Sequence, residues 1–67
     1  MRRTKEDAQR TREALVEAAL VVFGRKGYTR TTLTDIAKQA GLTRGALYWH
    51  FDSKEQIYGE MNHILAM

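Results

Sequence analysis

The sequence predicts an all-α fold: a three-helix helix-turn-helix domain followed by the start of a fourth, linking helix. Three observations predict it. Apolar residues recur at helical spacing along the chain. There is no proline, and Gly27 and Gly41 stand where helices are expected to end. Residues that can cap a helix precede each of the later apolar segments. With 67 residues, the chain has room for one small domain.

The first segment predicts a basic arm and a long helix. Residues 1–6 are basic and are expected to extend into solvent. The first helix is expected over 7–26, where Gly27 provides a C-terminal cap after two basic residues. Its apolar face comprises Leu15, Ala18, Ala19, Val22 and Phe23, and Val16, Leu20 and Val21 widen that face beyond what one small core needs.

The next two helices are expected to meet at a sharp turn. Thr32 and Asp35 have the spacing of a capping box, and Gly41 permits the tight turn that ends the second helix. Thr43 is expected to cap a third helix over 44–50. The wedge between these helices is filled by Ile36, Ala37, Ala40, Leu42 and Leu47. Residues 7–52 therefore predict a homeodomain-like helix-turn-helix domain.

A fourth helix is predicted from residue 53, because Ser53 and Gln56 repeat the capping-box spacing. Its apolar stripe of Ile57, Met61, Ile64 and Leu65 approaches the last residue. The stripe suggests either a chain cut from a longer protein or a helix that continues into a second domain. We expect residues 53–67 to be the start of that linking helix.

Composition narrows the classes of function. The absence of cysteine excludes disulfides and thiolate metal sites, and no apolar run is long enough for a membrane span or a secretory signal. We therefore expect a cytoplasmic protein with no membrane partner. Residues 1–50 hold ten Lys or Arg against five Asp or Glu, whereas residues 51–67 hold one against three. The basic part would attract phosphates of nucleic acid, although it would also attract an anionic membrane.

The start of the second helix offers candidate phosphate contacts. Thr31 and Thr32 combine hydroxyl groups with backbone N–H groups at a positive helix end. Thr32 could instead serve only as a cap. Thr34, one turn further on, could also face a DNA duplex.

The third helix offers candidate base contacts. Arg44 stands at its front, and a guanidinium can bridge O6 and N7 of guanine, although a solvated surface arginine is the alternative. Gly45 and Ala46 lack bulk, which would let the helix backbone lie close to DNA, and Ala46 could touch a thymine methyl group. Both could equally be small only for helix packing.

Tyr48, Trp49 and His50 are consecutive, so they cannot all point inward, whereas Leu47 and Phe51 occupy the core face. The exposed rings are expected to position the backbone of DNA. For Trp49, burial against the fourth helix is the alternative. Because no second ligand lies at metal spacing from His50, no metal, cofactor or catalytic residue is expected.

Lys54 lies in the first turn of the fourth helix, where a cation opposes the helix dipole. A phosphate contact would explain its place there.

These residues resemble the N-terminal DNA-binding domain of the tetracycline-repressor (TetR) family of bacterial regulators. The resemblance covers about residues 11–61 and rests on ALVEAALVVFGRKGY, TTLTDIAKQAGLTRGALYWHF and SKEQI. It implies that Arg44, Gly45 and Tyr48 match positions that reach bases. It also implies that Thr32, Thr43, Trp49, His50 and Lys54 match positions that hold phosphates.

The resemblance further implies a homodimeric repressor on a palindromic double-stranded DNA operator. A larger C-terminal domain, absent from this sequence, would bind a small-molecule inducer and form the dimer. The arm and the TRGALYWHF block are most similar to repressors of multidrug efflux pump genes. The alternative function is a helical protein-interaction module, with an exposed stripe around Ile57, Met61 and Ile64 and an incidental basic face.

Overall fold

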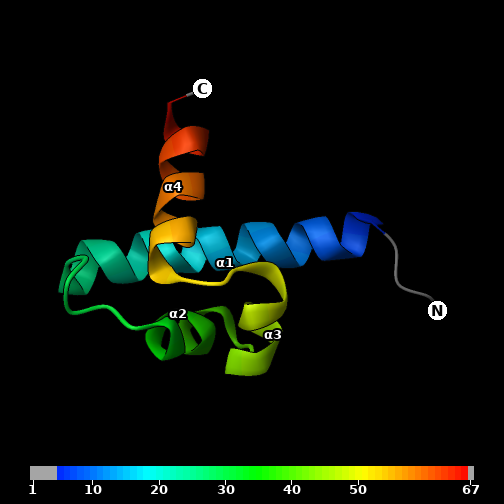
Figure 1. Cartoon of the computed structure of the whole chain (residues 1–67), viewed down its shortest axis with the longest axis horizontal. Helices are drawn as coiled ribbons and strands as arrows, with labels where there is room; N and C mark the ends of the chain where they lie inside the picture. The colour runs from blue at the N-terminus through cyan, green and yellow to red at the C-terminus, as the bar shows by residue number, and fades with distance from the viewer. Residues whose placement is uncertain (1–4, 67) are drawn as a thin grey trace.

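The computed structural model describes residues 5–66, and it folds them into helices without a strand. In chain order the helices are α1 (Lys5–Lys26), α2 (Leu33–Ala40), α3 (Arg44–His50) and α4 (Lys54–Leu65). Figure 1 shows α2 and α3 on one side of the long α1, with α4 crossing α1 and rising on the other side. The predicted all-α class with a helix-turn-helix at α2 and α3 is confirmed.

The N-terminal boundary differs from the expectation. The helix begins at Lys5 rather than at residue 7, so residues 5 and 6 of the expected arm are helical. Glu6 and Asp7 lie in the first turn, where acidic side chains favour the positive end of a helix. The rest of the expected arm, with Arg2 and Arg3, lies outside the described residues.

The turn between α2 and α3 forms as the sequence predicts. Gly41 adopts a left-handed conformation with φ of 74°, and its N–H donates to the carbonyl of Lys38 at 3.0 Å. The N–H of Leu42 then donates to the carbonyl of Ala37 at 2.9 Å. These two bonds satisfy carbonyls at the end of α2, so the chain can reverse directly into α3.

One core joins all four helices. The side chains predicted to fill it from α1, α2 and α3 are buried, and Ala40 and Leu42 pack against its edge. The buried apolar residues are Leu15, Val16, Ala18, Ala19, Val22, Phe23, Ile36, Ala37, Leu47, Phe51, Ile57 and Met61. Because Phe51 ends α3 and Ile57 belongs to α4, this core fixes the angle at which α3 is held against the body of the domain.

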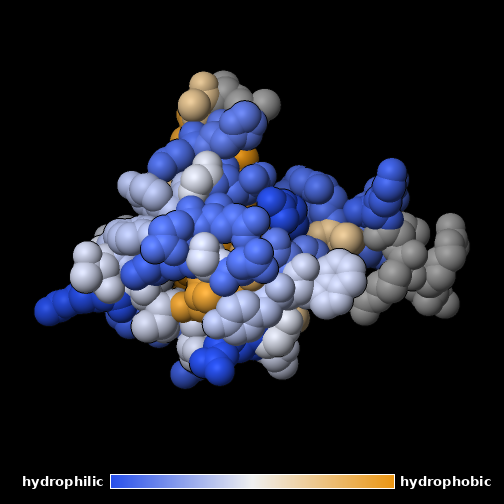
Figure 2. Space-filling model, in the orientation of Figure 1, coloured by the Kyte–Doolittle hydropathy of each residue, from blue (hydrophilic) through white to orange (hydrophobic). Residues whose placement is uncertain are grey.

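Only the outer part of the apolar stripe of α4 is exposed, whereas the alternative of a protein-interaction module placed Ile57 and Met61 on the surface as well. Ile57 and Met61 are buried in the core, because α4 packs directly against α1. Ile64 and Leu65 are exposed. Figure 2 shows a largely hydrophilic face of the molecule, with apolar patches on the outer part of α4 and between α1 and α2.

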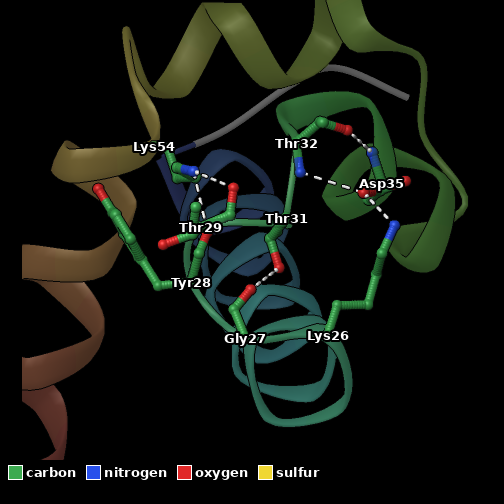
Figure 3. A network of polar contacts seen from close by, with 8 residues as sticks. All are labelled: Lys26, Gly27, Tyr28, Thr29, Thr31, Thr32, Asp35 and Lys54. Carbon is green, nitrogen blue, oxygen red and sulfur yellow. Dashed lines mark hydrogen bonds and ion pairs between the residues drawn. The ribbon is translucent and has the colours of Figure 1, made fainter.

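The start of α2 is tied to the end of α1 by an acidic side chain (Figure 3). Thr32 caps α2, accepting from the N–H of Asp35 at 3.1 Å, and the Asp35 carboxylate accepts from the N–H of Thr32 at 3.1 Å. The ammonium of Lys26 lies 2.8 Å from the same carboxylate. The hydrogen bond from Lys26, followed by that from the Thr32 N–H, lowers the pKa of Asp35 from 3.8 to about 2.

The lowered pKa of Asp35 predicts that the domain loses stability in acid. Because the folded pKa of Asp35 lies below its ordinary value, its stabilising contribution is present above pH 3.8 and disappears as the pH falls toward 2. In D35N, which removes the charge, we expect a lower urea midpoint at pH 5 and a shallower decline between pH 4 and pH 2. Urea unfolding followed by circular dichroism at each pH measures both. D52N removes a carboxylate at an exposed position and is the control; parallel curves for wild type and D35N would contradict the prediction.

Candidate nucleic-acid interface

Arg44 lies on the exposed surface at the first position of α3 and touches α2. Its Nη1 donates to the hydroxyl of Thr34 at 3.3 Å, and its guanidinium carbon lies 6.0 Å from the centre of the Tyr48 ring. A guanidinium carries five N–H donors, so a single bond to Thr34 leaves most of them for another partner. Thr34 and Tyr48 therefore limit the directions in which this side chain can extend.

Gly45 is not small for the sake of packing. A methyl group added there would meet only the Thr43 hydroxyl, at an ordinary contact distance of 3.9 Å. The residue is exposed on the second position of α3, and its neighbour Ala46 is partly buried. Nothing among the described residues thus requires the absence of a side chain at position 45, which favours close approach by something outside the domain.

The aromatic residues of α3 face solvent, as the spacing predicts. The Trp49 side chain is 82% exposed and Tyr48 is 47% exposed, whereas Leu47 and Phe51 are buried. Burial of Trp49 against α4, the alternative considered above, is therefore wrong. The imidazole of His50 is half-buried, and its ring centre lies 5.7 Å from that of Trp49. Two large rings exposed on one short helix, with their neighbours anchored in the core, form a rigid surface.

Thr31 does not have the place expected for a phosphate contact. Its side chain is only 1% exposed, and its hydroxyl donates to the carbonyl of Gly27 at 2.7 Å. Its backbone N–H donates to the carbonyl of Tyr28 at 3.2 Å. Both donors are occupied in closing the turn after α1 (Figure 3), so Thr31 is a structural residue and leaves the candidate interface.

Thr32 and Thr43 cap the starts of α2 and α3, as the sequence predicts. Both are exposed, and each hydroxyl oxygen accepts a backbone N–H at the start of its helix, from Asp35 and Ala46 respectively, at 3.1 Å. In each case the oxygen acts as acceptor, so the hydroxyl hydrogen is left to donate. A cap of this kind can hold the helix and bind an anion at the same time.

Lys54 has a structural role that the sequence does not predict. Its ammonium donates to the carbonyls of Tyr28 at 2.9 Å and Thr29 at 3.5 Å (Figure 3), and it lies 4.4 Å from the centre of the Tyr28 ring. The lysine thus joins the start of α4 to the turn after α1, which explains a cation in the first turn. In the turn after α1, partial burial, followed by the charge of Glu55, raises the pKa of the Tyr28 phenol. One of the three donors of Lys54 is left for a phosphate.

Comparison with known proteins identifies the family. A sequence model described as "Bacterial regulatory proteins, tetR family" matches residues 15–61, which is most of the chain. The chain belongs to the TetR family. The matched residues include α2, the turn and α3, and the predicted family resemblance is thereby confirmed.

Two bacterial regulators are similar to this chain over nearly its whole length. The HTH-type transcriptional regulator TtgR of Pseudomonas putida is 56% identical over 57 residues, which cover 85% of this chain and 27% of TtgR. The probable acrEF/envCD operon repressor of Escherichia coli is 50% identical over 60 residues, which cover 90% of this chain and 27% of the repressor. The chain thus spans about a quarter of the length of these regulators.

A solved structure agrees with the fold. The crystal structure of native NalD, described as the secondary repressor of the MexAB-OprM multidrug efflux pump in Pseudomonas aeruginosa, superposes with a TM-score of 0.79. It is 47% identical and covers 82% of this chain and 28% of NalD. At this identity the likeness supports the fold.

Sequence reasoning missed Arg12 in this TetR-family domain. Its Nη1 donates to the carbonyl of His50 at 3.1 Å, and its Nη2 lies 3.4 Å from the Glu60 carboxylate. The available signal was its position three residues before Leu15, which puts a charged residue in line with the buried face of α1.

Residues 5–66 offer neither a metal centre nor a membrane span. No group of three or more His, Cys, Asp or Glu side chains in this range could hold a metal ion. None of the helices in the same range combines the length and the apolar character that crossing a bilayer requires.

Proposed function

We propose that this chain binds double-stranded DNA in a sequence-specific manner, with α3 in the major groove. The observation that carries the proposal is the outer face of α3. Arg44, Gly45, Tyr48 and Trp49 are exposed there, while Leu47 on the same helix is buried. In helix-turn-helix proteins the N-terminal residues of the second helix contact base edges, and Arg44 has this place here.

The proposed contacts divide into two kinds. Arg44 would bond to a guanine, Gly45 and Ala46 would admit the helix deep into the groove, and Tyr48 would touch a base edge. The phosphates on either side would be held by Thr32, Thr43, Trp49, His50 and Lys54. The caps and Lys54 are already fixed by bonds within the domain, so little side-chain freedom would be lost when they bind.

In the intact regulator we propose a homodimer on a palindromic operator. Two copies of α3 related by two-fold symmetry would occupy major grooves about 34–36 Å apart. The printed descriptions of NalD and of the acrEF/envCD operon protein both name a repressor, and that of NalD names a multidrug efflux pump. We propose a repressor of efflux pump genes, working on cytoplasmic DNA. A small-molecule inducer, bound by a C-terminal domain beyond these 67 residues, would release it.

Titration with a duplex at several salt concentrations tests the proposed function. The operator would first be obtained by selecting bound duplexes from a random pool, which also gives its symmetry and half-site separation. Binding through phosphate contacts should weaken steeply with salt, with a log–log slope of about −0.9 for each phosphate neutralised. Salt-independent binding, or no binding to any duplex, would overturn the proposal.

The variant Gly45→Ala distinguishes an effect on stability from an effect on DNA binding. Alanine has the higher helix propensity and meets nothing closer than 3.9 Å, so the variant should be as stable as wild type or more stable by up to about 1 kcal/mol. The added methyl group should move α3 away from the bases and weaken operator binding about tenfold, which corresponds to the loss of one base contact. Thermal unfolding and operator titration measure the two effects. Gly59→Ala, at an exposed helical glycine with open space around it, is the control. Unchanged affinity in G45A would contradict close approach at this position.

A further inference from the structure

Outside the common core, the side chain of Arg12 adds a polar link from α1 to the end of α3 and to α4. In the packing of the helices, α3 lies mainly against α2, whereas α4 lies mainly against α1. In Figure 1 the short segment from α3 to α4 runs along α1, and α4 then crosses α1. Arg12 extends from α1 and contacts the end of α3, Phe51 at the start of this segment, and α4.

Each contact of Arg12 satisfies a different need. The carbonyl of His50, at the last position of α3, has no partner within the helix, and Nη1 donates to it at 3.1 Å. The guanidinium lies over the Phe51 ring, with its central carbon 4.4 Å from the ring centre. Nη2 lies 3.4 Å from the Glu60 carboxylate on α4. The planar guanidinium can make all three contacts at once, whereas the compact ammonium of a lysine cannot.

The contacts of Arg12 bear on the candidate interface as well as on stability, because they lie next to its exposed rings. His50 and Phe51 immediately follow Tyr48 and Trp49, the exposed rings of the candidate interface. Any movement of the carbonyl of His50 would turn the last part of α3 and these rings with it. Arg12 itself lies on α1 with a partly buried side chain.

We propose that Arg12 is a positioning residue for DNA binding, which acts by fixing the C-terminal end of α3 against Glu60 on α4. This inference rests on the proposed function of α3. Arg12 orients the part of the interface that holds phosphates, and Glu60 holds the guanidinium in the direction that this requires. A change in the position of Glu60 would therefore change the orientation of the rings on α3.

The test compares R12K, E60Q, their double variant and R12Q with two matched controls. R10K replaces an exposed arginine of α1 by lysine and is the control for R12K. E13Q replaces an exposed glutamate of α1 by glutamine and is the control for E60Q. Three quantities are measured on folded protein: the Kd for the selected operator, the salt slope of binding, and amide hydrogen exchange. The amide of Phe51, bonded to Leu47 at the end of α3, reports on the proposed link. The amide of Ile36, bonded to Thr32 in α2, is the internal reference.

We expect R12K to weaken operator binding about tenfold, a size common for residues within one hydrogen-bond network, without changing the salt slope. Exchange at Phe51 should accelerate relative to Ile36. E60Q should show the same changes to a smaller extent, and the double variant should be no worse than R12K, because the two residues act as a unit. The controls should match wild type. E60Q keeps an oxygen that can accept from Arg12, so it serves as the milder variant if R12K does not fold.

Several results would overturn the inference. Operator affinity equal to wild type in folded R12K and E60Q would leave Arg12 a purely structural residue. A salt slope lowered by about 1 in folded R12Q, which removes the positive charge that R12K keeps, would make it a phosphate contact instead. Exchange that accelerates equally at Phe51 and Ile36 would show general destabilisation. If the wild-type protein bound no duplex, the proposed function would be overturned together with this role, and that result is distinct from the other three.

Discussion

Replacing Arg44 with alanine is expected to reduce affinity for the preferred operator by about 1–3 kcal/mol and to relax the choice of base at one position of each half-site. The reason is the geometry of the guanidinium, which is exposed at the start of α3 and is held to one side by Thr34 and Tyr48. Titration with the operator and with duplexes changed at each base pair in turn measures both effects.

The loss of a positive charge must be separated from the loss of a base contact. Arg25→Ala removes an equally charged, exposed side chain from the end of α1 and should leave base preference unchanged. If R44A discriminated among operator variants as wild type does, Arg44 would not read a base. In that case the specificity of α3 would have to come from Tyr48 or from the shape of the DNA.

Replacing Phe51 with alanine is expected to lower the free energy of unfolding by about 3–5 kcal/mol. The ring is 1% exposed, lies in the common core at the end of α3, and forms the surface over which the Arg12 guanidinium is placed. A domain of 67 residues has little stability in reserve, so we expect much of the variant to be unfolded.

Urea unfolding followed by circular dichroism measures this loss. Phe51→Leu keeps most of the apolar volume but removes the aromatic face, and it should be less destabilised than F51A. A loss below about 1 kcal/mol in F51A would mean that the core closes without this ring, contrary to the burial seen here.

The elements of the fold could be predicted because their signals are local. Thr32 with Asp35, Gly41, and Thr43 each form bonds within a few residues of themselves, so their spacing in the sequence already contains the geometry. The same holds for the aromatic residues of α3, since a helix that buries Leu47 and Phe51 must turn Trp49 outward.

The residues that were missed or misplaced depend on contacts that the sequence does not display. Arg12 and Glu60 are 48 positions apart, and Lys54 reaches carbonyls 25 and 26 positions before it. Thr31 and Thr32 are adjacent threonines, and their pattern alone does not reveal which of them faces the core. The structure decides it, because the chain after Gly27 turns the first inward and leaves the second to cap α2.

The helices that carry the candidate interface are short, with 8 residues in α2 and 7 in α3. Helices of this length do not persist in water without neighbours. A peptide excised from this region would lose its shape, and so would the intact domain on melting. The fraction of protein competent to occupy an operator is therefore the folded fraction. Anything that shifts the melting equilibrium, whether heat, acid or a neighbouring domain, changes the apparent affinity for the operator in proportion to that fraction.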